Sequence, residues 1–568
     1  MVLPCLAQFT FYPFFLEAKM KRTAIHVLTI FAVIALALTP AWAQAGKEKQ
    51  PARKPAPAAV KNVDEGVCYG CHTEIQELKG KGKHAKGMNC ALCHPDTSGH
   101  LSDSAQKPIT RLDLEICGSC HQEQYRTLLE VNLKSKAKLE KSTTTSRSPT
   151  FDKLMVPHGF TKEHDEPRSH VFMLSDHMIV DRGYGGRFQL KDWTYIDKTG
   201  KLWDIIADTG KELPQTAKAA NTVCLLCKTS DVVMKWPYMG DPNPNSPLKR
   251  APNPAAIEMA KNHLQNAVGC IHCHDPHAAK PRVIRDALIE VVVDRGEGTY
   301  PYDKQKSKEV TIQKVMFKRG GQEFRAIGLL SKPDSNLMCA QCHVEYNCNP
   351  GFNPQTGAAV GMDSRLANYY PWVNVFDLQK KYESVGFKDF RHAVTGAALT
   401  KIQHPEVETF WGSKHERAGL ECKDCHMPKV KPKKGKEYTF HGQRSARYML
   451  KDTCLRCHPD WTAEQAEYEV DAVQNYVRGK MRKAEFWLGE LINAFIRAKD
   501  AGVGEDILKE ARKEHDKAHI LWEWWTAENS DGFHNPDFAR QSLAESIDAS
   551  QKGIEILNKA ISQRAAAK

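Results

Sequence analysis

Pairs of cysteines separated by two residues recur along the chain, and in seven copies a histidine follows the second cysteine directly. In this pattern the two thiols can add to the vinyl groups of a haem, and the histidine can bind the iron as its proximal ligand. An eighth pair, Cys224 and Cys227, is followed by Lys228 instead. The seven proximal histidines are His72, His94, His121, His274, His343, His426 and His458. Their cysteines are Cys68 and Cys71, Cys90 and Cys93, Cys117 and Cys120, Cys270 and Cys273, Cys339 and Cys342, Cys422 and Cys425, and Cys454 and Cys457.

The cysteine count favours haem attachment over the other uses of paired cysteines. The eight pairs account for sixteen of the 18 cysteines and leave only Cys5 and Cys348. Disulfides do not require an adjacent histidine, and zinc ribbons pair their cysteines without one. The sequence therefore predicts eight covalently bound haem c groups.

Lys228 distinguishes one haem site from the other seven. Two histidine ligands fill both axial positions of a haem iron, whereas chemistry on a substrate needs one open position. A lysine amine binds a metal only when it is deprotonated, which opposes its normal protonation in water. This cost favours a special role for Lys228, and a passive substitution for histidine is the alternative.

The motifs and their order resemble a known family. The segments CLLCK, CIHCH, CAQCHVEY, KIQHP, CKDCHMPK and CLRCH are similar to those of the pentahaem cytochrome c nitrite reductases. With three further motifs before them, the chain resembles the octahaem cytochrome c nitrite reductases. The resemblance implies a mainly α fold with haems as its core, little β structure and long C-terminal helices. It also implies an oxidoreductase that converts nitrite to ammonium, with hydroxylamine and, more slowly, sulfite as further substrates.

The same resemblance implies the catalytic residues. Lys228 corresponds to the lysine of the catalytic haem, Tyr346 follows HVE, and His404 lies in QHP. The distal arginine corresponds to Arg182, with Arg168 as the alternative. In that arrangement Arg182 and His404 would donate to the negative charge on the nitrite oxygens, and His404 and Tyr346 would pass protons.

A calcium site and a covalent cross-link are also implied around Tyr346. Glu345 and Gln403 would hold the calcium together with backbone carbonyls, and Gln403 also belongs to the catalytic group. The carbonyls are those of Tyr346 and Lys401, and an all-oxygen set suits calcium. The alternative is that Glu345 and Gln403 only form hydrogen bonds. Cys348 is expected to form a thioether with Tyr346, and a buried free thiol is the alternative.

Seven histidine-bearing haems require seven distal ligands. The candidates that the resemblance implies for the later motifs are His170, His415, His441 and His534. For the N-terminal haems, His84 and His100 are the candidates. The choice between ligand and surface residue stays open for His158, His164, His177, His263, His277 and His392.

The first 45 residues predict export from the cytoplasm. Residues 20–43 combine a basic start, an apolar run and small residues at Ala41 and Ala43, which is typical of a cleaved signal peptide. Residues 1–19 are expected to be an over-called extension, and a retained anchor is the alternative to cleavage. Covalent haem attachment takes place outside the cytoplasm in bacteria, so the sequence predicts a periplasmic location.

The remaining chain must supply the elements that hold the haems. A linker rich in Pro, Ala and Lys covers residues 46–63. Residues 64–150 are expected to form a three-haem domain, and residues 151–460 a catalytic five-haem domain. Residues 461–568 should form long helices, with an apolar stripe that packs on the catalytic domain or forms a subunit interface. The predicted helices span 463–501, 505–525 and 536–562.

The formal charge of +12 does not indicate a nucleic-acid partner. Each haem brings two propionates, so the basic side chains are expected to pair with these and to attract small anions. The predicted partners are nitrite, an electron-donor protein or quinol-linked cytochrome, and further copies of the chain in a homo-oligomer. Three other functions stay open, namely hydroxylamine oxidation as in related octahaem enzymes, tetrathionate reduction, and electron conduction without catalysis.

Overall fold

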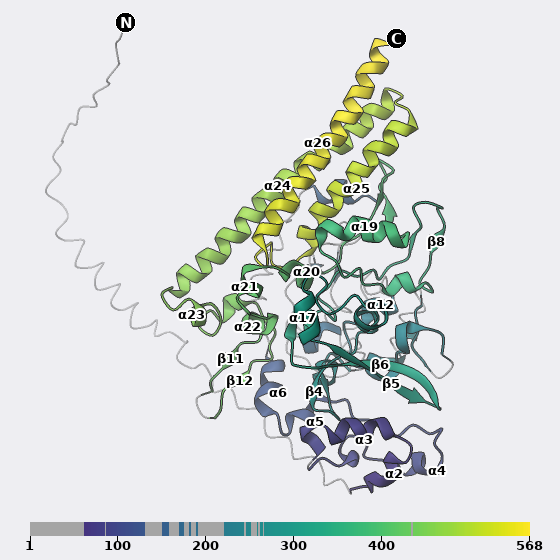
Figure 1. Ribbon diagram of the computed structural model, residues 1–568, viewed down its shortest axis with the longest axis vertical. Helices are drawn as coiled ribbons and strands as arrows, with labels where there is room; N and C mark the ends of the chain where they lie inside the picture. The colour runs from purple at the N-terminus through teal and green to yellow at the C-terminus, as the bar shows by residue number, and fades with distance from the viewer. Residues whose placement is uncertain are drawn as a thin grey trace, which may run out of the picture. The chain divides into compact units, whose positions relative to one another are not determined.

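Three long helices form the C-terminal part of the chain (Figure 1). Their bounds are Ala463–Asp500 for α24, Glu505–Ala527 for α25 and Pro536–Ala566 for α26. The side chains of Thr462 and Asn535 cap α24 and α26 by accepting hydrogen bonds from backbone N–H groups of the first turn. Pro536 occupies the first position of α26, where its missing N–H is not needed. All three helices were expected from the sequence, with nearly the same ends.

The computed structural model divides the chain into two units, Met1–Ala58 and Ala59–Lys568, and all that is described here belongs to the second. The described residues are 62–85, 87–130, 150–157, 170–174, 181–182, 189–190, 221–243, 246–251, 258–259, 262–264, 266–432 and 435–567. The signal peptide and most of the linker lie outside these residues, and the domain boundaries stay predictions.

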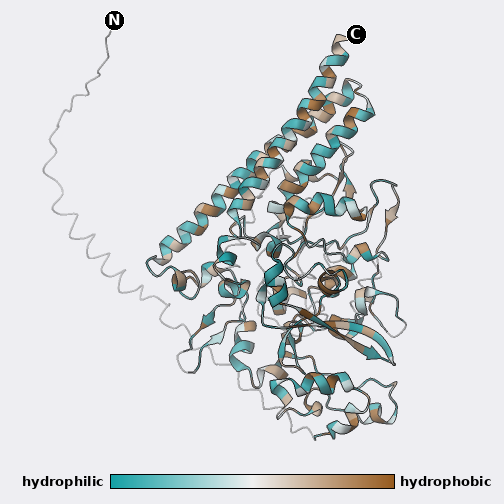
Figure 2. Ribbon diagram, viewed as in Figure 1, coloured by the Kyte–Doolittle hydropathy of each residue, from teal (hydrophilic) through white to brown (hydrophobic). Residues whose placement is uncertain are grey.

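Buried apolar residues pack α24, α25 and α26 against one another. Figure 2 shows apolar and polar residues alternating along each helix, as one buried and one solvated face require. Phe495 of α24, Trp522 of α25 and Leu543 of α26 are all fully buried in this core. Trp522 Nε1 also donates a hydrogen bond to Glu485 Oε1 at 3.2 Å. The core extends to α8 (Phe151–Met155) and α19 (Val375–Val385).

A four-stranded antiparallel sheet lies between the N-terminal helices and the later haem motifs in sequence. The strand order is β3-β4-β6-β5, with β3 at His274–Asp275, β4 at Lys280–Val283, β5 at Ile312–Arg319 and β6 at Gln322–Leu330. Gly320 and Gly321 join β5 to β6, and both have positive φ angles, as a tight hairpin turn requires. Leu78 from the N-terminal segment packs on this sheet beside Ile327 and Leu329.

The other elements are short, as expected where haems take the place of a protein core. The N-terminal helices are α2 (Glu65–Tyr69), α3 (Thr73–Gly80), α4 (Ser98–Ser102), α5 (Leu114–Gly118) and α6 (Gln122–Leu128). Later helices are α12 (Thr222–Leu225), α13 (Val232–Lys235), α15 (Cys270–Cys273), α16 (Asp286–Ile289), α17 (Lys304–Glu309), α18 (Ser335–Cys339), α20 (Glu406–Phe410), α21 (Lys414–Arg417), α22 (Cys422–His426) and α23 (Cys454–Cys457). Two-residue strands form the pairs β1 (Asp181–Arg182) with β2 (Gln189–Leu190), β7 (Gly351–Phe352) with β8 (Ala359–Val360), β9 (Phe390–Arg391) with β10 (Ala398–Leu399), and β11 (Lys429–Val430) with β12 (Tyr438–Thr439). The short 3₁₀ and π segments are Lys83–Ala85, Cys90–Leu92, His170–Phe172, Tyr238–Gly240, Glu290–Asp294, Arg365–Asn368 and Ala446–Tyr448.

The prediction of a mainly helical fold with little β structure is confirmed. Within the described part of the chain, no helix is both long enough and apolar enough to cross a bilayer.

Candidate haem centres and active site

Each attachment motif sits on a short helical turn, which brings its two cysteines to the same side of the backbone. The N–H of the motif histidine donates to the carbonyl of the first cysteine, at 3.0 Å for His72 and 2.9 Å for His121. The described cysteines are all free thiols, so no disulfide competes for them. Both observations fit thioether attachment of haem.

The spacing of several histidine rings matches what two axial ligands of one iron require. Two metal–nitrogen bonds of about 2 Å, plus about 1.1 Å from each nitrogen to its ring centre, place two axial imidazole centres about 6.2 Å apart. Four motif histidines have a second histidine ring at this distance. The ring-centre distances are 6.2 Å for His72 and His100, 6.3 Å for His121 and His84, 6.3 Å for His343 and His170, and 6.2 Å for His426 and His534.

The other three motif histidines lie close enough to a second histidine for the electrostatic effect of one ring to reach the other. Burial is the main cause that lowers the pKa of His94, and the charge of His277 lowers it further. Burial and, to a smaller extent, the charge of His441 lower the pKa of His274 to about 4. Burial and, to a smaller extent, the charge of His458 lower the pKa of His415.

Hydrogen bonds at Nδ1 orient many of these rings and leave Nε2 available for a metal. The bonds run from His84 to Pro276 O at 3.0 Å, His100 to Gln106 O at 2.7 Å, His426 to Arg444 O at 3.1 Å and His441 to Thr439 O at 2.8 Å. All six distal candidates that the sequence suggested are thus placed near a motif histidine. His277, which acts on His94, is a further candidate that the sequence left open, because no spacing rule links a distal ligand to its haem.

Other histidines have different surroundings. His392 donates from Nε2 to Lys153 O at 3.0 Å and lies 5.2 Å from the ring of His515. His519 donates to Thr400 O at 3.1 Å. His158, His164 and His177 lie outside the described residues.

Lys228 follows α12, whose start is fixed by Asn221. The Asn221 side chain accepts from Val223 N at 3.0 Å and from Cys224 N at 3.1 Å, and it donates to Cys348 O at 2.7 Å. This last bond connects the lysine motif to the segment that carries Tyr346. The Lys228 side chain is half-buried.

Tyr346 and His404 lie together beside the lysine motif. Their ring centres are 6.4 Å apart with the planes inclined by 25°. Tyr346 is 4% exposed. Burial lowers the pKa of His404 to about 3, Glu406 opposes this, and the charge of Lys228 acts in the same direction as burial, so Lys228 lies within electrostatic reach of His404. The structure therefore brings together three of the residues that the sequence assigned to catalysis.

Glu345 forms a buried oxygen cluster with the QHP segment. It is fully buried and accepts hydrogen bonds from Gln403 N at 2.7 Å and from Tyr382 Oη at 2.8 Å. Burial raises the pKa of Glu345 to about 8, so a cation here would stabilise its charged form. The described residues contain no group of three or more His, Cys, Asp or Glu side chains arranged to hold a metal. A calcium site here would therefore need amide and carbonyl oxygens as further ligands, and the sequence analysis predicts such ligands.

Two further predicted residues are less well defined by the structure. Cys348 is 4% exposed, and its thiol contacts that of Cys224, which raises the pKa of Cys348. Burial raises the pKa of Tyr346 well above its usual value, and the charge of Cys348 acts in the same direction, so the two side chains lie within electrostatic reach of each other. Arg182 lies in β1, where only the backbone is described, and Arg168 is outside the described residues.

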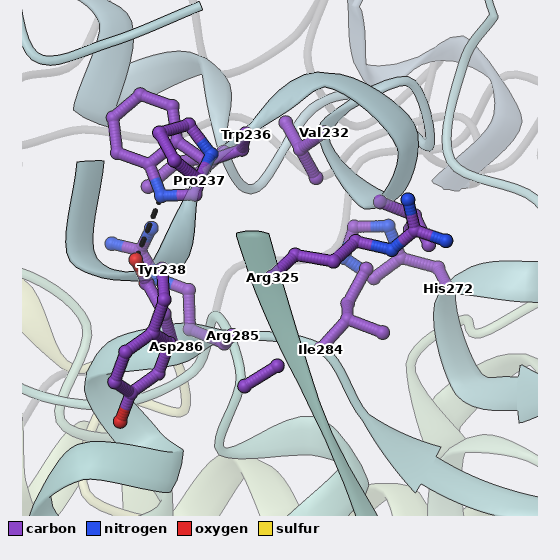
Figure 3. A pocket seen from close by; sticks show the side chains of 12 residues that line it. Val232, Trp236, Pro237, Tyr238, His272, Ile284, Arg285, Asp286 and Arg325 are labelled. Atoms are coloured by element: carbon purple, nitrogen blue, oxygen red, sulfur yellow. Dashed lines mark hydrogen bonds between the residues drawn. The ribbon is translucent and has the colours of Figure 1, made fainter. Parts of the chain in front are cut away.

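A small pocket is lined by residues of α13, α16 and β6 (Figure 3). Arg285 lines it and is 3% exposed, yet neither Nη atom has a hydrogen-bond partner among the described residues. Its Nε donates to Tyr370 Oη at 2.9 Å, and its guanidinium lies 5.7 Å from the ring centre of Tyr346. Buried His272 also lines the pocket, with Nδ1 unpaired in the described structure. Unpaired buried donors of this kind fit the carboxylates of a haem.

Comparisons with known proteins agree with this geometry. The chain is 28% identical over 432 residues to the cytochrome c nitrite reductase subunit NrfA of Nitratidesulfovibrio vulgaris, which covers 72% of this chain and 68% of that protein. It is also 28% identical over 403 residues to cytochrome c-552 of Parabacteroides distasonis, which covers 70% of this chain and 65% of that protein.

The fold is similar to that of the cytochrome c nitrite reductase NrfA from Desulfovibrio desulfuricans. The TM-score is 0.54 at 21% identity, over 79% of this chain and 86% of that one. At this identity the likeness shows the fold alone. A family model described as cytochrome c552 matches residues 121–568. Because this match spans more than half of the sequence, the chain belongs to the cytochrome c552 family.

Proposed function

We propose that this chain is an octahaem cytochrome c that reduces nitrite to ammonium at the haem attached through Cys224 and Cys227. One contrast carries the proposal. The seven other motifs supply a histidine with a second histidine nearby, whereas this motif supplies Lys228, and the histidine within its electrostatic reach, His404, lies 6.4 Å from the ring of Tyr346. The relatives whose names include nitrite reductase agree with this activity.

The reaction takes nitrite, six electrons and eight protons to ammonium and two waters. When bound, the haems supply the electrons and one iron with an open position. Lys228 would bind that iron from one side, with Arg182, or Arg168 as the alternative, attracting the anion. His404 and Tyr346 would donate hydrogen bonds to the nitrite oxygens and pass protons to them. Tyr346 is 4% exposed, which limits the access of bulk water on its side of the site.

We further propose that calcium binds to Glu345, Gln403 and the carbonyls of Tyr346 and Lys401. The short Gln403 N–Glu345 Oε2 bond brings the two segments together. The ion would hold the QHP segment, and with it His404, in place. We place the enzyme in the periplasm as a homo-oligomer, supplied by an electron-donor protein or a quinol-linked cytochrome.

The decisive experiment measures ammonium released from nitrite by the purified holoprotein with a reduced viologen dye as donor. Lys228→His should retain eight haems but lower turnover at least tenfold, because a histidine changes the ligand under the reactive iron. The control is Lys552→His, since that side chain is 64% exposed and lies in α26, which carries no attachment motif. Full turnover by Lys228→His would contradict the assignment. Oxidation of hydroxylamine without nitrite reduction would instead favour the related octahaem oxidoreductases.

A further inference from the structure

Two of the axial histidines contact a buried carboxylate instead of a neutral oxygen. His343 Nδ1 lies 3.4 Å from Glu406 Oε2, and His534 Nδ1 lies 2.6 Å from Glu528 Oε1. Glu406 is 7% exposed and Glu528 is 1% exposed. By contrast, other histidines have a hydrogen bond between Nδ1 and a carbonyl or hydroxyl oxygen, which carries no formal charge. These histidines are His84, His94, His100, His426 and His441.

Neither carboxylate is neutralised by a basic side chain within the described structure. Glu406 accepts from Asn529 N at 3.2 Å and also from Asn529 Nδ2. Glu528 accepts from Ser530 N at 3.0 Å, Ser530 Oγ at 2.9 Å and Gly532 N at 3.1 Å. All of these donors are neutral, so they stabilise the negative charge without cancelling it.

Two other carboxylates near axial histidines differ in this respect. Asp275 lies 3.7 Å from His277 Nδ1, but its other oxygen pairs with Arg282 at 2.7 Å. Glu74 lies 3.8 Å from His72, but its own side chain is 25% exposed, against 9% for that of Glu406, so solvent screens its charge more. Only Glu406 and Glu528 therefore combine burial with an uncompensated charge among the described axial sites.

We propose that Glu406 and Glu528 are positioning residues that lower the reduction potentials of the haems attached at Cys339–Cys342 and Cys422–Cys425. The two contacts act through charge, because neither Glu406 Oε2 nor His534 Nδ1 has a hydrogen-bond partner in the described structure. A negative charge beside an axial ligand in a low-dielectric interior favours the ferric state over the ferrous state, which lowers the potential.

These two haem sites are neighbours of each other and of the lysine motif. The Cys342 thiol contacts that of Cys227, and the Cys339 thiol contacts that of Cys422. With lowered reduction potentials, the haems at Cys339–Cys342 and Cys422–Cys425 would pass electrons on to the haem at Cys224–Cys227 and would not retain them. This role rests on the proposed function, but the potentials themselves do not depend on nitrite turnover.

The test is a spectroelectrochemical titration of the holoprotein, with individual haems followed by EPR. In the wild-type protein, two of the haems with two histidine ligands should have lower reduction potentials than the other five. Glu406→Gln and Glu528→Gln should each raise the potential of one haem by at least a tenfold change in its reduction equilibrium, which is 59 mV for one electron. Glu528→Gln also changes the acceptor of three hydrogen bonds in the Ser530–Gly532 turn, so Glu406→Gln is the principal variant. Haem content is measured for both variants.

The matched control is Glu408→Gln, two residues further along α20. Glu408 is fully buried, and its Oε1 accepts from Glu345 N at 2.9 Å instead of facing an axial histidine. Glu408→Gln should therefore leave every potential unchanged. Unchanged potentials in Glu406→Gln with full haem content would overturn the inference, as would a wild-type protein without two distinctly low haems. Shifted potentials in a protein that does not reduce nitrite would overturn the proposed function alone.

Discussion

Lys228 and Tyr346 show how single residues distinguish one haem site from the others. The motif histidines contact or face other histidines, which would fill both sides of an iron. In the proposed site, Lys228 would replace this arrangement by an amine on one side, with His404 and Tyr346 as two proton-carrying side chains nearby. A site that must hold a substrate through many electron transfers needs this asymmetry, whereas a conducting site needs symmetry.

We expect the peptide that contains Tyr346 and Cys348 to be lighter by two hydrogens than its sequence predicts. The two side chains are buried neighbours, and a thioether between them would hold the phenol ring in place. Mass spectrometry of the digested holoprotein measures this directly. Tyr346→Phe should restore the unmodified mass at Cys348, and a free Cys348 thiol in the wild-type protein would contradict the prediction.

The attachment residues could be predicted from sequence because the motif contains both cysteines and the ligand within five residues. The distal ligands could not be predicted in the same way, because they come from segments that only the fold brings near. His277 illustrates this, since it follows His274 by three residues but lies near His94. The carboxylates behind His343 and His534 likewise depend on contacts that no local spacing encodes.

At the scale of elements, the C-terminal helices depend on close contact between α24 and α26. A Cβ atom at Gly553 would lie 2.7 Å from Leu491 Cδ1, so the helices meet where no side chain intervenes. We expect Gly553→Val to lower the free energy of unfolding by about 1–3 kcal/mol through overpacking. The midpoint of thermal unfolding, followed by far-UV circular dichroism, measures the effect.

Gly479 in α24 provides the matched control. A Cβ atom there would meet nothing within 4 Å, so Gly479→Ala should stabilise the helix by up to about 1 kcal/mol. Equal effects of the two substitutions would show that helix propensity, and not packing, determines the first result.

Glu421 joins α22 to α18, and this connection should depend on pH. Its Oε2 accepts from Ser335 N at 2.8 Å and from Ser335 Oγ at 2.9 Å, and it pairs with Lys423. Burial alone would raise the pKa of Glu421, but Lys423 and Ser335 outweigh this effect and lower the pKa below its usual value of 4.5. A lowered folded-state pKa contributes stability above about pH 4.5, and this contribution is lost as the pH falls further.

We therefore expect Glu421→Gln to reduce the free energy of unfolding by about 1–2 kcal/mol at neutral pH, with a difference that shrinks towards about pH 3. Chemical denaturation of both proteins at several pH values measures this. A constant difference across the range would indicate that the carboxylate charge is not involved.

Helices and hairpins differed in how well the sequence revealed them. The apolar stripe of residues 463–501 repeats over many turns, and long periodic patterns are the most reliable kind. The β5–β6 hairpin was not anticipated, although Gly320 and Gly321 mark its turn. Its strands are partly buried on both faces, so they lack the simple alternation that identifies a half-exposed strand.

At the scale of the whole molecule, the family match begins at residue 121 and leaves the cysteine pairs at Cys68, Cys90 and Cys117 outside. We expect eight haems per chain, measured by the pyridine haemochrome assay against protein concentration and by intact mass. The spacing of His72 and His100, and of His121 and His84, supports haem binding in this additional segment. Five haems per chain would instead indicate that haem is attached only within residues 121–568, the part that the family model matches.

The pairing of His94 with His277, and the bond from His84 to Pro276, connect the N-terminal motifs to a segment almost two hundred residues away. A fragment that ends before residue 221 would carry three cysteine pairs but would lack the second axial group predicted for one of them. We expect the iron at that site to bind carbon monoxide in the fragment, whereas the same site in the intact protein should not. One amino-terminal haem would therefore depend on a segment that is synthesised long after its own attachment motif.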